Sequence, residues 1–486
     1  MGFNIPEMRT RTQQAMLWTT LFLLLARLVY VHIGQLDLSP DEAQYWDWSR
    51  HLDWSYATKP PLVAWLIALT TSVFGDGYVG VRFFPILALA VIPWLAYGIV
   101  RNMVGRKAAL WAFVLTTCTP LLAAGGLLMT PDVPSVTLWL VGLYLLSKIE
   151  VEEGGELRDW LTLGVVIGVA GLAKPSVALF FPLAFGFLYF NHPRWLLRPH
   201  FWVAGLVALA CQAPVLYWNW AHDWPMFHHL QDQADSDERW QGWKSFTDFV
   251  VNQAVVIGPL TFAGMVLAWF VAGRRCSLLW WFSAPVFIGF LTMSFLGKVQ
   301  ANWPVLGMAT GLLLLAVILP TTKPWHRAVV AVGLAINMLL VVIMHDTFLL
   351  RQIGIELPIK RDPTKTMLGW RELGNQLQTS LEKYPEAVVI TTRYQTASGL
   401  AFHTPSQPEV LYLNPGWRRD NQYDYWAWPD LTGKPLLYVT ELGLMTDVIS
   451  NRFAPCREVA NLNAERGGLT LRKATVFYCE NKPTRR

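Results

Sequence analysis

An acidic pair, Asp41 and Glu42, opens a charged and aromatic-rich stretch, LSPDEAQYWDWSRHLDWSYATKPPLVA (38–64), that lies between apolar segments. Ser39 and Pro40 before the pair are typical of a helix start, where Glu42 closes a capping box with Ser39. Capping alone explains Glu42 as local structure. An Asp41 carboxylate at a helix start is held ionised by the helix dipole and can serve as a general base toward a hydroxyl or amine. We therefore predict Asp41 and Glu42 as catalytic residues, with helix capping as the alternative.

Three lysines add positive charge to the same predicted surface. Lys59 precedes Pro60 in the stretch, Lys174 precedes Pro175, and Lys298 begins a polar turn. A single lysine at a membrane boundary usually extends its ammonium toward water and has no further role. Several cations gathered near lipid headgroups fit a phosphate or pyrophosphate better than a neutral ligand. We predict Lys59, Lys174 and Lys298 as the residues that bind a donor phosphate.

Further polar and aromatic residues complete the predicted site. Asp132, in a Thr-Pro-Asp turn, either caps the next helix or orients a cation as an accessory acid. Aromatic residues with amides, imidazoles and acids suit contact with a sugar or an acceptor, although anchoring at the membrane interface explains the tryptophans equally well. The predicted substrate-contacting residues are Tyr45, Trp46, Asn219, His222 and Asp223.

The sequence does not require a cofactor. None of the five cysteines forms a CxxC or a Cys/His metal spacing, and no glycine-rich phosphate loop or dinucleotide fingerprint is present. Two carboxylates on one face, Asp41 and Asp132, are compatible with a divalent cation without demanding one. We therefore expect no required cofactor, with a divalent metal held by these two acids as the alternative.

The elements that must position these residues are membrane helices. Of 486 residues, 53% are hydrophobic and 15% are charged, and 25 are tryptophan, which collects at membrane interfaces. Apolar runs predict about eleven spans within residues 1–349. The net charge of +5 is small, and its lysines and arginines stand mostly in short loops, which excludes a nucleic-acid-binding surface.

The loop charges predict the topology of this membrane domain. Alternate loops carry most of the basic residues, and the positive-inside rule assigns them, with the N-terminus, to the cytoplasm. The count holds if residues 60–75 lie along the interface, and it sends the reactive loop (34–78) and the other predicted site residues to the opposite, outer face. The cytoplasmic basic residues are Arg101, Arg106, Lys107, Arg194, Arg198, Arg274, Arg275, Lys323 and Arg327.

The chain changes character after about residue 350, where helix-like and strand-like segments alternate. We predict a small α/β domain over 350–486 on the outer side. Cys456 and Cys479 can pair there if the compartment is oxidising. The predicted elements are a helix at 369–384 and strands at 387–391, 410–413, 436–439 and 470–478.

Short motifs across the membrane region give the chain a family resemblance. The most specific is DEAQYW at 41–46, followed by KPPL at 59–62, TPD at 130–132, LAKP at 172–175, YWN at 217–219 and NWP at 302–304. With these motifs the chain resembles the bacterial branch of the protein O-mannosyltransferase and aminoarabinose–lipid A transferase superfamily, the membrane glycosyltransferases with a GT-C fold. The resemblance implies that Asp41 is the catalytic residue and that Lys59 contacts the donor phosphate.

The function implied by the resemblance is sugar transfer with inversion at the outer, periplasmic face of a bacterial inner membrane. The donor would be a polyprenyl-phosphate sugar, and the acceptor lipid A, another glycolipid or a protein. Two other functions use the same polar outer face: a transporter or flippase for lipid-linked sugars, and a membrane-anchored glycan sensor. A transporter predicts functional charges near mid-membrane, and a sensor leaves Asp41, Lys59 and Lys174 without a role.

Overall fold

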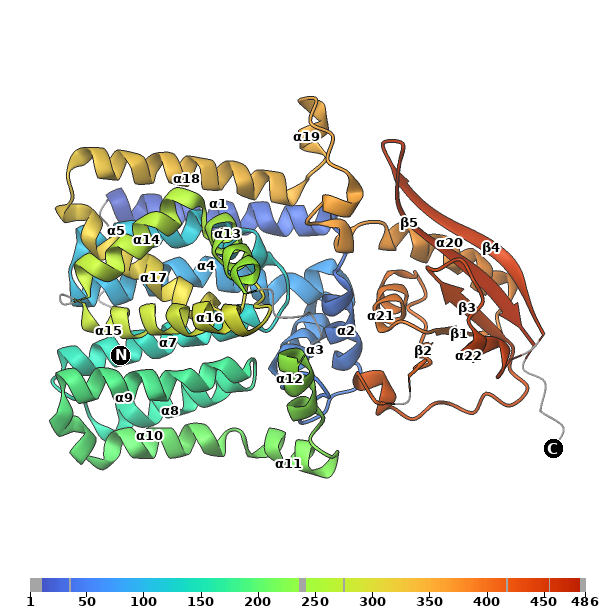
Figure 1. Cartoon of the computed structure of the whole chain (residues 1–486), viewed down its shortest axis with the longest axis horizontal. Coiled ribbons are helices and arrows are strands. Elements are labelled where there is room, and N and C mark those ends of the chain that lie inside the picture. Colours follow the sequence, from blue (N-terminus) through green and yellow to red (C-terminus); the bar gives the residue numbers. More distant parts are fainter. Residues whose placement is uncertain are drawn as a thin grey trace.

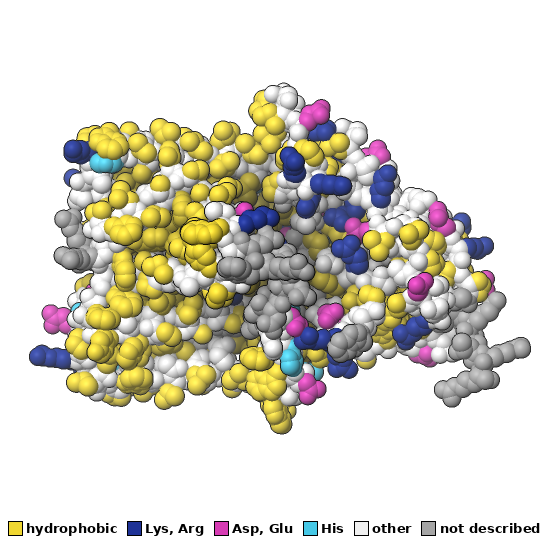
Figure 2. All heavy atoms as spheres, in the orientation of Figure 1, with side chains coloured by type: hydrophobic (Ala, Val, Ile, Leu, Met, Phe, Trp, Pro, Cys, Tyr) yellow, Lys and Arg dark blue, Asp and Glu magenta, His cyan; other side chains and the backbone are white. Residues whose placement is uncertain are grey.

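The computed structural model describes residues 11–34, 36–235, 242–273, 276–416, 418–453 and 455–480. A helical part runs from residue 11 to about residue 345, and a smaller α/β part follows it (Figure 1). We call this smaller part the outer domain, after the side of the membrane that the sequence predicts for it. Hydrophobic side chains cover most of the visible face of the helical part, whereas charged side chains gather at the boundary and over the outer domain (Figure 2). An apolar surface of this extent is characteristic of a protein embedded in lipid.

The described helical part contains five helices that are long and apolar enough to cross a membrane, or up to eight if each bent pair is one span. The five are α1 (Arg11–Ile33), α4 (Tyr78–Met103), α7 (Asp132–Val151), α15 with α16 (Ser277–Trp281, Ala284–Leu296) and α18 (Pro324–His345). The bent pairs are α5 with α6 (Arg106–Cys118, Pro120–Ala123), α10 with α11 (Pro199–Ala210, Ala213–Ala221) and α13 with α14 (Trp243–Ile257, Pro259–Ala272). The remaining helices are α2 (Pro40–Ser49), α3 (Leu62–Phe74), α8 (Leu157–Gly171), α9 (Phe180–Asn191), α12 (Pro225–Asp235) and α17 (Val305–Ile318).

The expected number of about eleven spans is therefore not confirmed. Several apolar runs that read as single spans are broken, most sharply at Gly258 and Pro259, where the two halves are bent by 107°. Proline lacks an amide hydrogen and Gly258 has a φ of +92°, so the helix ends there.

Helix α17 forms the centre of the helical part, and every residue of it is buried. Its only polar side chain, Thr310, accepts a hydrogen bond from the Trp139 indole at 3.0 Å. The turns between α4 and α5, α9 and α10, and α17 and α18 all lie at the end remote from the outer domain (Figure 1). The basic residues in those turns therefore share one end of the molecule, as the loop charges predict; Arg274 and Arg275 lie outside the described residues.

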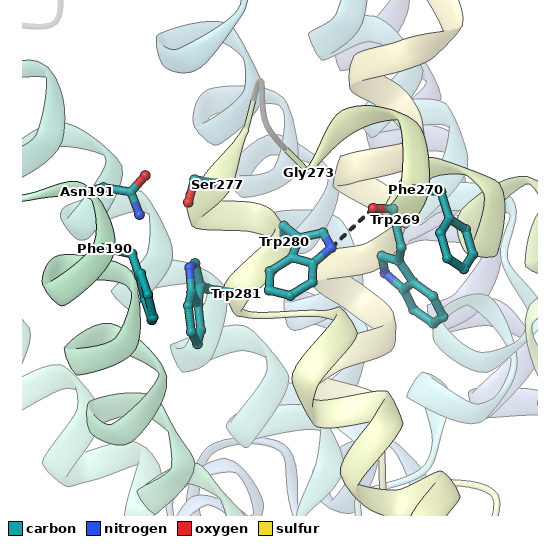
Figure 3. Close-up of a pocket in the computed structure, with 8 residues that line it drawn as sticks. All are labelled: Phe190, Asn191, Trp269, Phe270, Gly273, Ser277, Trp280 and Trp281. Carbon is teal, nitrogen blue, oxygen red and sulfur yellow. Dashed lines mark hydrogen bonds between the residues drawn. The ribbon is translucent and has the colours of Figure 1, made fainter.

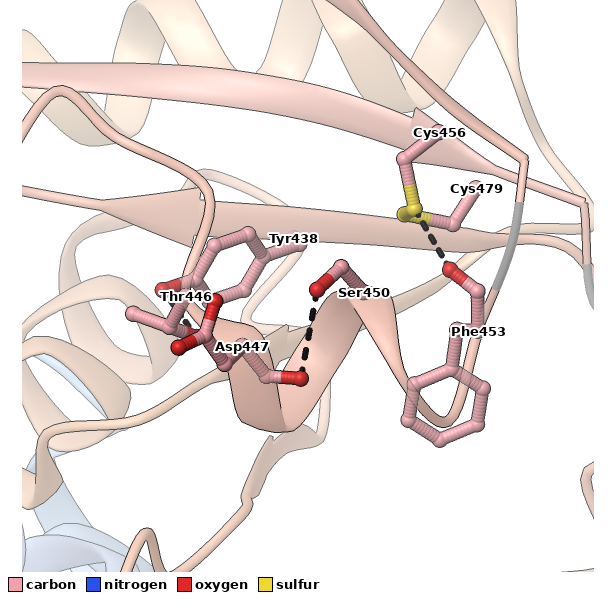
Figure 4. Close-up of a disulfide and its surroundings, with 7 residues drawn as sticks. All are labelled: Tyr438, Thr446, Asp447, Ser450, Phe453, Cys456 and Cys479. Atoms are coloured by element: carbon pink, nitrogen blue, oxygen red, sulfur yellow. Dashed lines mark hydrogen bonds between the residues drawn. A yellow bond between two sulfur atoms is a disulfide. The ribbon is translucent and has the colours of Figure 1, made fainter.

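The outer domain contains a five-stranded mixed sheet in the order β2-β1-β3-β5-β4. β1 is parallel to β2 and β3, whereas β5 is antiparallel to β3 and β4. A disulfide joins Cys456 and Cys479 at the ends of β4 and β5, beside α22 (Figure 4). The strands are β1 (Val388–Thr391), β2 (Val410–Tyr412), β3 (Leu436–Thr440), β4 (Cys456–Arg466) and β5 (Leu469–Cys479), and the helices are α19 (Leu349–Gln352), α20 (Trp370–Lys383), α21 (Tyr394–His403) and α22 (Asp447–Ser450).

Helix α2 lies between the helical part and the outer domain (Figure 1). Residues of α2 and α3 pack in one apolar cluster with residues of α20, α21 and the sheet. Hydrogen bonds secure the same junction: the Leu38 amide donates to His403 Nε2 at 3.2 Å, and the Ala57 amide donates to Gln422 Oε1 at 2.8 Å. Residues on both sides of α2, Leu38 before it and Ala57 after it, are thus hydrogen-bonded to the outer domain.

Candidate active site

A cavity of about 690 Å³ lies where the helical part meets the outer domain. Its lining comes from α2, the turns that contain Lys59, Asp132 and Lys174, helix α12, and α16 with the segment after it. Two segments of the outer domain complete the lining. Six of the residues predicted from the sequence line this one cavity: Asp41, Tyr45, Lys59, Asp132, Lys174 and Lys298. The structure therefore brings together acids and lysines that are up to 257 positions apart in the chain (41 to 298); their catalytic and binding roles stay predictions.

Asp41 lies in the first turn of α2, two residues after the Ser39 N-cap that the sequence predicts. The Ser39 side chain accepts from the Glu42 amide, and the Glu42 side chain accepts in return, so the capping box is formed. The Asp41 side chain is exposed to the cavity and has no hydrogen bond or ion pair with any other described residue. Its carboxyl is available to a ligand.

The environment of Asp41 differs from the expected one. The helix dipole was expected to hold this carboxylate ionised, but the protein that surrounds it on most sides keeps bulk water away. This desolvation raises the pKa of Asp41, against the opposing charge of Lys59 and with the help of Glu42. A raised pKa makes the carboxylate a stronger base when it is deprotonated.

Lys59 is the cation that acts most directly on Asp41. Desolvation lowers its pKa, Asp41 opposes that effect, and the nearby charge of Lys174 adds to it. Among the described residues, no hydrogen bond or ion pair is formed by the Lys59 ammonium. A desolvated ammonium without a direct partner is ready to receive an anion.

The second acid and lysine are paired with each other. Lys174 Nζ donates to Asp132 Oδ1 at 2.6 Å, and Asn302 Nδ2 donates to Asp132 Oδ2 at 2.6 Å. Both carboxylate oxygens of Asp132 are therefore engaged, and three turns of the helical part are tied together. Within the described ranges, no group of three or more His, Cys, Asp or Glu residues is arranged to hold a metal ion.

Glu42, predicted with Asp41 as a catalytic residue, points away from the cavity. Its carboxylate is fully buried and accepts from Arg82 Nε and Nη2, both at 2.8 Å. The amides of Ser39 and Met129 also donate to it, each at 3.0 Å. Burial would raise the pKa of Glu42, but the Arg82 charge and these donors outweigh it, and the pKa lies below its usual value. Glu42 is therefore placed as a positioning residue.

The other predicted substrate-contacting residues divide in the same way. Tyr45 lines the cavity, whereas the Trp46 indole donates to Asp76 at 2.8 Å and packs edge-on against Phe402 of the outer domain. Like Trp46, the remaining three do not line the cavity: Asn219 is buried against Ser55, His222 stacks on Trp218, and Asp223 is exposed.

Sequence reasoning missed Arg82, Tyr394 and Asp420. Tyr394 and Asp420 line the cavity, and Arg82 pairs with Glu42. His229, which follows the predicted His222 and Asp223 in the chain, lines the cavity as well. Arg82 carried a usable signal, because an arginine inside an apolar run is rare unless it is paired or functional. Tyr394 and Asp420 carried none, because only the docking of the outer domain onto α2 brings them to the site.

A second hollow, of about 480 Å³, lies at the opposite end of the helical part between α9, α14 and α15 (Figure 3). Aromatic rings from these helices line most of it, and the Trp280 indole donates to the Trp269 carbonyl there at 3.1 Å. None of the described residues that line it is charged. It therefore lacks the acid–base and phosphate-binding groups of the first cavity.

Known proteins to which this chain is similar are named as sugar transferases. A family model described as dolichyl-phosphate-mannose-protein mannosyltransferase matches residues 58–218. The lipid A galacturonosyltransferase RgtD of Rhizobium johnstonii is 28% identical over 295 residues, which cover 59% of this chain and 62% of that protein. An undecaprenyl phosphate-alpha-4-amino-4-deoxy-L-arabinose arabinosyl transferase of Pseudomonas fluorescens is 28% identical over 274 residues, which cover 51% of this chain and 47% of that protein. The matched regions thus span less than two thirds of either relative.

Solved structures show the fold. The crystal structure of ArnT from Cupriavidus metallidurans bound to undecaprenyl phosphate matches with a TM-score of 0.65 and 15% identity, over 95% of this chain and 97% of that chain. Its apo form matches with a TM-score of 0.62 and 17% identity, over 96% and 98% of the two chains. The helical part and the outer domain together therefore have the ArnT-like GT-C arrangement.

The buried ion pair of Glu42 gives a prediction about stability. Arg82→Met leaves the Glu42 carboxylate buried without its cation, and removal of one partner from a buried pair costs about 3–5 kcal/mol. The free energy of unfolding in detergent should fall by that amount. As a control, Arg158→Met removes an arginine from an exposed pair with Glu156, for which we expect a change within about 1 kcal/mol. Equal losses in the two variants would contradict the positioning role of Arg82.

Proposed function

We propose that this chain, a member of the GT-C superfamily of membrane glycosyltransferases, transfers a sugar from a polyprenyl-phosphate donor to an acceptor at the outer face of a bacterial inner membrane. The observation that carries the proposal is that the Asp41 carboxyl and the Lys59 ammonium share one cavity, each without a direct partner among the described residues. An acid and a cation in this state suit proton removal and anion binding.

The lysines form the phosphate side of the proposed site. Lys59 would contact the donor phosphate. Lys298 and Lys174, the latter paired with Asp132, line the same cavity. The phosphate leaves with the electron pair of its bond to the anomeric carbon, so its negative charge grows during the reaction. Cations placed where charge develops stabilise the transition state more than the ground state.

Asp41 would act as the general base. Its carboxylate removes the proton of the acceptor hydroxyl or amine, whose oxygen or nitrogen attacks the anomeric carbon from the side opposite the phosphate. A single displacement of this kind inverts the configuration at that carbon. The products are the glycosylated acceptor and free polyprenyl phosphate, and most of the remaining catalysis comes from holding both substrates in line.

The acceptor class is proposed from the relatives. RgtD is named as a lipid A galacturonosyltransferase, and this similarity favours a lipid A-like glycolipid over a protein acceptor. The two other functions weighed from the sequence, transport of a lipid-linked sugar and glycan sensing, share the outer cavity but form no new glycosidic bond. Product analysis therefore separates them from transfer.

Release of free polyprenyl phosphate tests the proposal. The purified full chain in lipid nanodiscs, given extracted polyprenyl-phosphate sugars and outer-membrane glycolipids, should release the carrier and add the sugar mass to an acceptor. Asp41→Asn keeps the shape of the side chain and removes the base, so release should fall about a hundredfold or more. Mass spectrometry of both lipids measures the two products.

The controls for this assay separate chemistry from folding. Asp430→Asn changes a fully exposed acid of the outer domain and should leave release unchanged. Because the pKa of Asp41 is raised, the wild-type rate should fall with decreasing pH through a value above the usual range for aspartate. An Asp41→Asn protein with wild-type release would exclude Asp41 as the base, and wild-type protein that releases no carrier would contradict sugar transfer.

The phosphate-binding role gives a second kinetic prediction. Lys59→Ala should raise the KM for the donor about tenfold and change the KM for the acceptor by less than about twofold, because only the donor carries the phosphate that Lys59 contacts. Initial rates with one substrate varied at a time give both values. Lys434→Ala, at an exposed lysine of the outer domain, is the matched control. Equal increases in the two KM values would argue that Lys59 has a structural role only.

A further inference from the structure

The outer domain contributes part of the cavity wall. Tyr394, the first residue of α21, and Asp420, in the segment between β2 and β3, both line the cavity. The lysines of the cavity all come from the helical part. The helical part also contributes two acids and a phenol, Asp41, Asp132 and Tyr45, whereas no described lining residue of the outer domain is a lysine or arginine. The lysine charges are therefore confined to the helical side of the cavity.

Asp420 is held in place through its backbone and not through its carboxylate. The Asp420 amide donates to Asp424 Oδ2 at 2.8 Å. Of the two arginines directly before Asp420, Arg418 donates to Asp232 of α12 at 3.0 Å and Arg419 lies over the Tyr425 ring, 5.0 Å from its centroid. Among the described residues, no hydrogen bond or ion pair is formed by the Asp420 carboxylate, and its side chain is exposed. Its acceptor atoms are thus open to the cavity.

Tyr394 reaches the cavity next to the proposed base. Burial raises its pKa to about 12, and the charge of Asp41 adds to this increase. The phenol therefore stays protonated and remains a hydrogen-bond donor at physiological pH. Tyr394 and Asp41 line the same cavity.

His229 of α12 also lines the cavity. Burial lowers its pKa to about 4, Lys59 of the helical part lowers it further, and Asp232 opposes them. The imidazole is therefore neutral at physiological pH and adds no positive charge beside Asp420. The outer-domain side keeps its acidic character.

The geometry points to a sugar-binding subsite formed by Tyr394 and Asp420, which hold hydroxyl or amino groups of the donor sugar while the lysines hold its phosphate. The inference rests on the proposed function and specifies its substrate class: a neutral or amino sugar, in contrast to the galacturonosyl group in the name of RgtD. Carboxylates and phenols are the usual partners of sugar hydroxyls and amines. A uronic acid would place a second carboxylate near Asp420, and like charges in a partly desolvated site repel.

A sugar on the acceptor presents the same hydroxyl groups, so the test must separate the two sources. Binding is measured to the full chain in nanodiscs without acceptor, with two ligands: a polyprenyl-phosphate hexose and polyprenyl phosphate alone. Tyr394→Phe and Asp420→Asn should each weaken binding of the hexose-bearing lipid about tenfold and leave binding of the bare lipid unchanged. Lys59→Ala should weaken binding of both lipids. Tyr384→Phe and Asp430→Asn, which do not line the cavity, are the matched controls.

The outcomes separate this inference from the proposed function. Unchanged binding of the hexose-bearing lipid, or equal loss for both lipids, would overturn the subsite, as would a loss that appears only when acceptor is present. A donor that carries a uronic acid should bind wild-type protein about tenfold more weakly than the hexose donor, and Asp420→Asn should reduce that difference; equal wild-type binding would overturn the substrate class. Absence of transfer by the wild-type chain with every donor contradicts the proposed function instead.

Discussion

The ion pair between Glu42 and Arg82 fixes the position of the reactive helix. Charges buried between apolar helices are stable only when they are paired and hydrogen-bonded, and here each charge has further partners. The Arg82 guanidinium also donates to the carbonyls of Leu36 and Asp37 at 3.0 and 2.9 Å, while Glu42 accepts from the Met129 amide. One buried pair thus joins α4, the chain before α2 and the turn before α7. Successive residues of a helix are rotated by about 100°, so anchoring Glu42 directs Asp41 to a different side.

The outer domain lines part of the cavity and is hydrogen-bonded to the segment that carries Asp41. Asp37, directly before the reactive helix, accepts from the Trp370 amide at 2.7 Å and from the Tyr78 hydroxyl at 3.2 Å. The Ser398 hydroxyl of α21 donates to the Pro40 carbonyl at 2.9 Å, one residue before Asp41. Because these bonds end on the residues that carry the proposed base, the domain that supplies Tyr394 and Asp420 also orients Asp41. Under the proposed function, docking of the two parts is therefore a condition for catalysis.

The sequence predicted the local features of this arrangement better than the distant ones. The capping box of α2 follows from four adjacent residues, and α20 and strands β1, β2, β3 and β5 follow from short patterns of apolar residues. Strand β4 was missed because its exposed residues alternate poorly with apolar ones. The gathering of Asp41 and Lys59 with Lys174 was predicted from the alternation of loops across the membrane, which depends on topology and not on packing.

The rest of the site depends on contacts that no local pattern contains. Glu42 has the sequence context of its neighbour Asp41, and only the partner across the helices, Arg82, shows that the two acids differ. Trp46 and Asn219 sit in motifs with substrate-like chemistry, yet they bond to Asp76 and Ser55 and secure the loop. The number of spans was not confirmed for a similar reason, because helix breaks such as the one at Gly258 are hidden within continuous apolar runs.

A structure of the full chain with a polyprenyl-phosphate sugar bound would test the central claim most directly. The account predicts that the donor phosphate lies within hydrogen-bond distance of Lys59 and that the anomeric carbon lies beside Asp41, in the cavity between α2 and the outer domain. A donor headgroup bound elsewhere, for example in the aromatic hollow between α9 and α15, would contradict it.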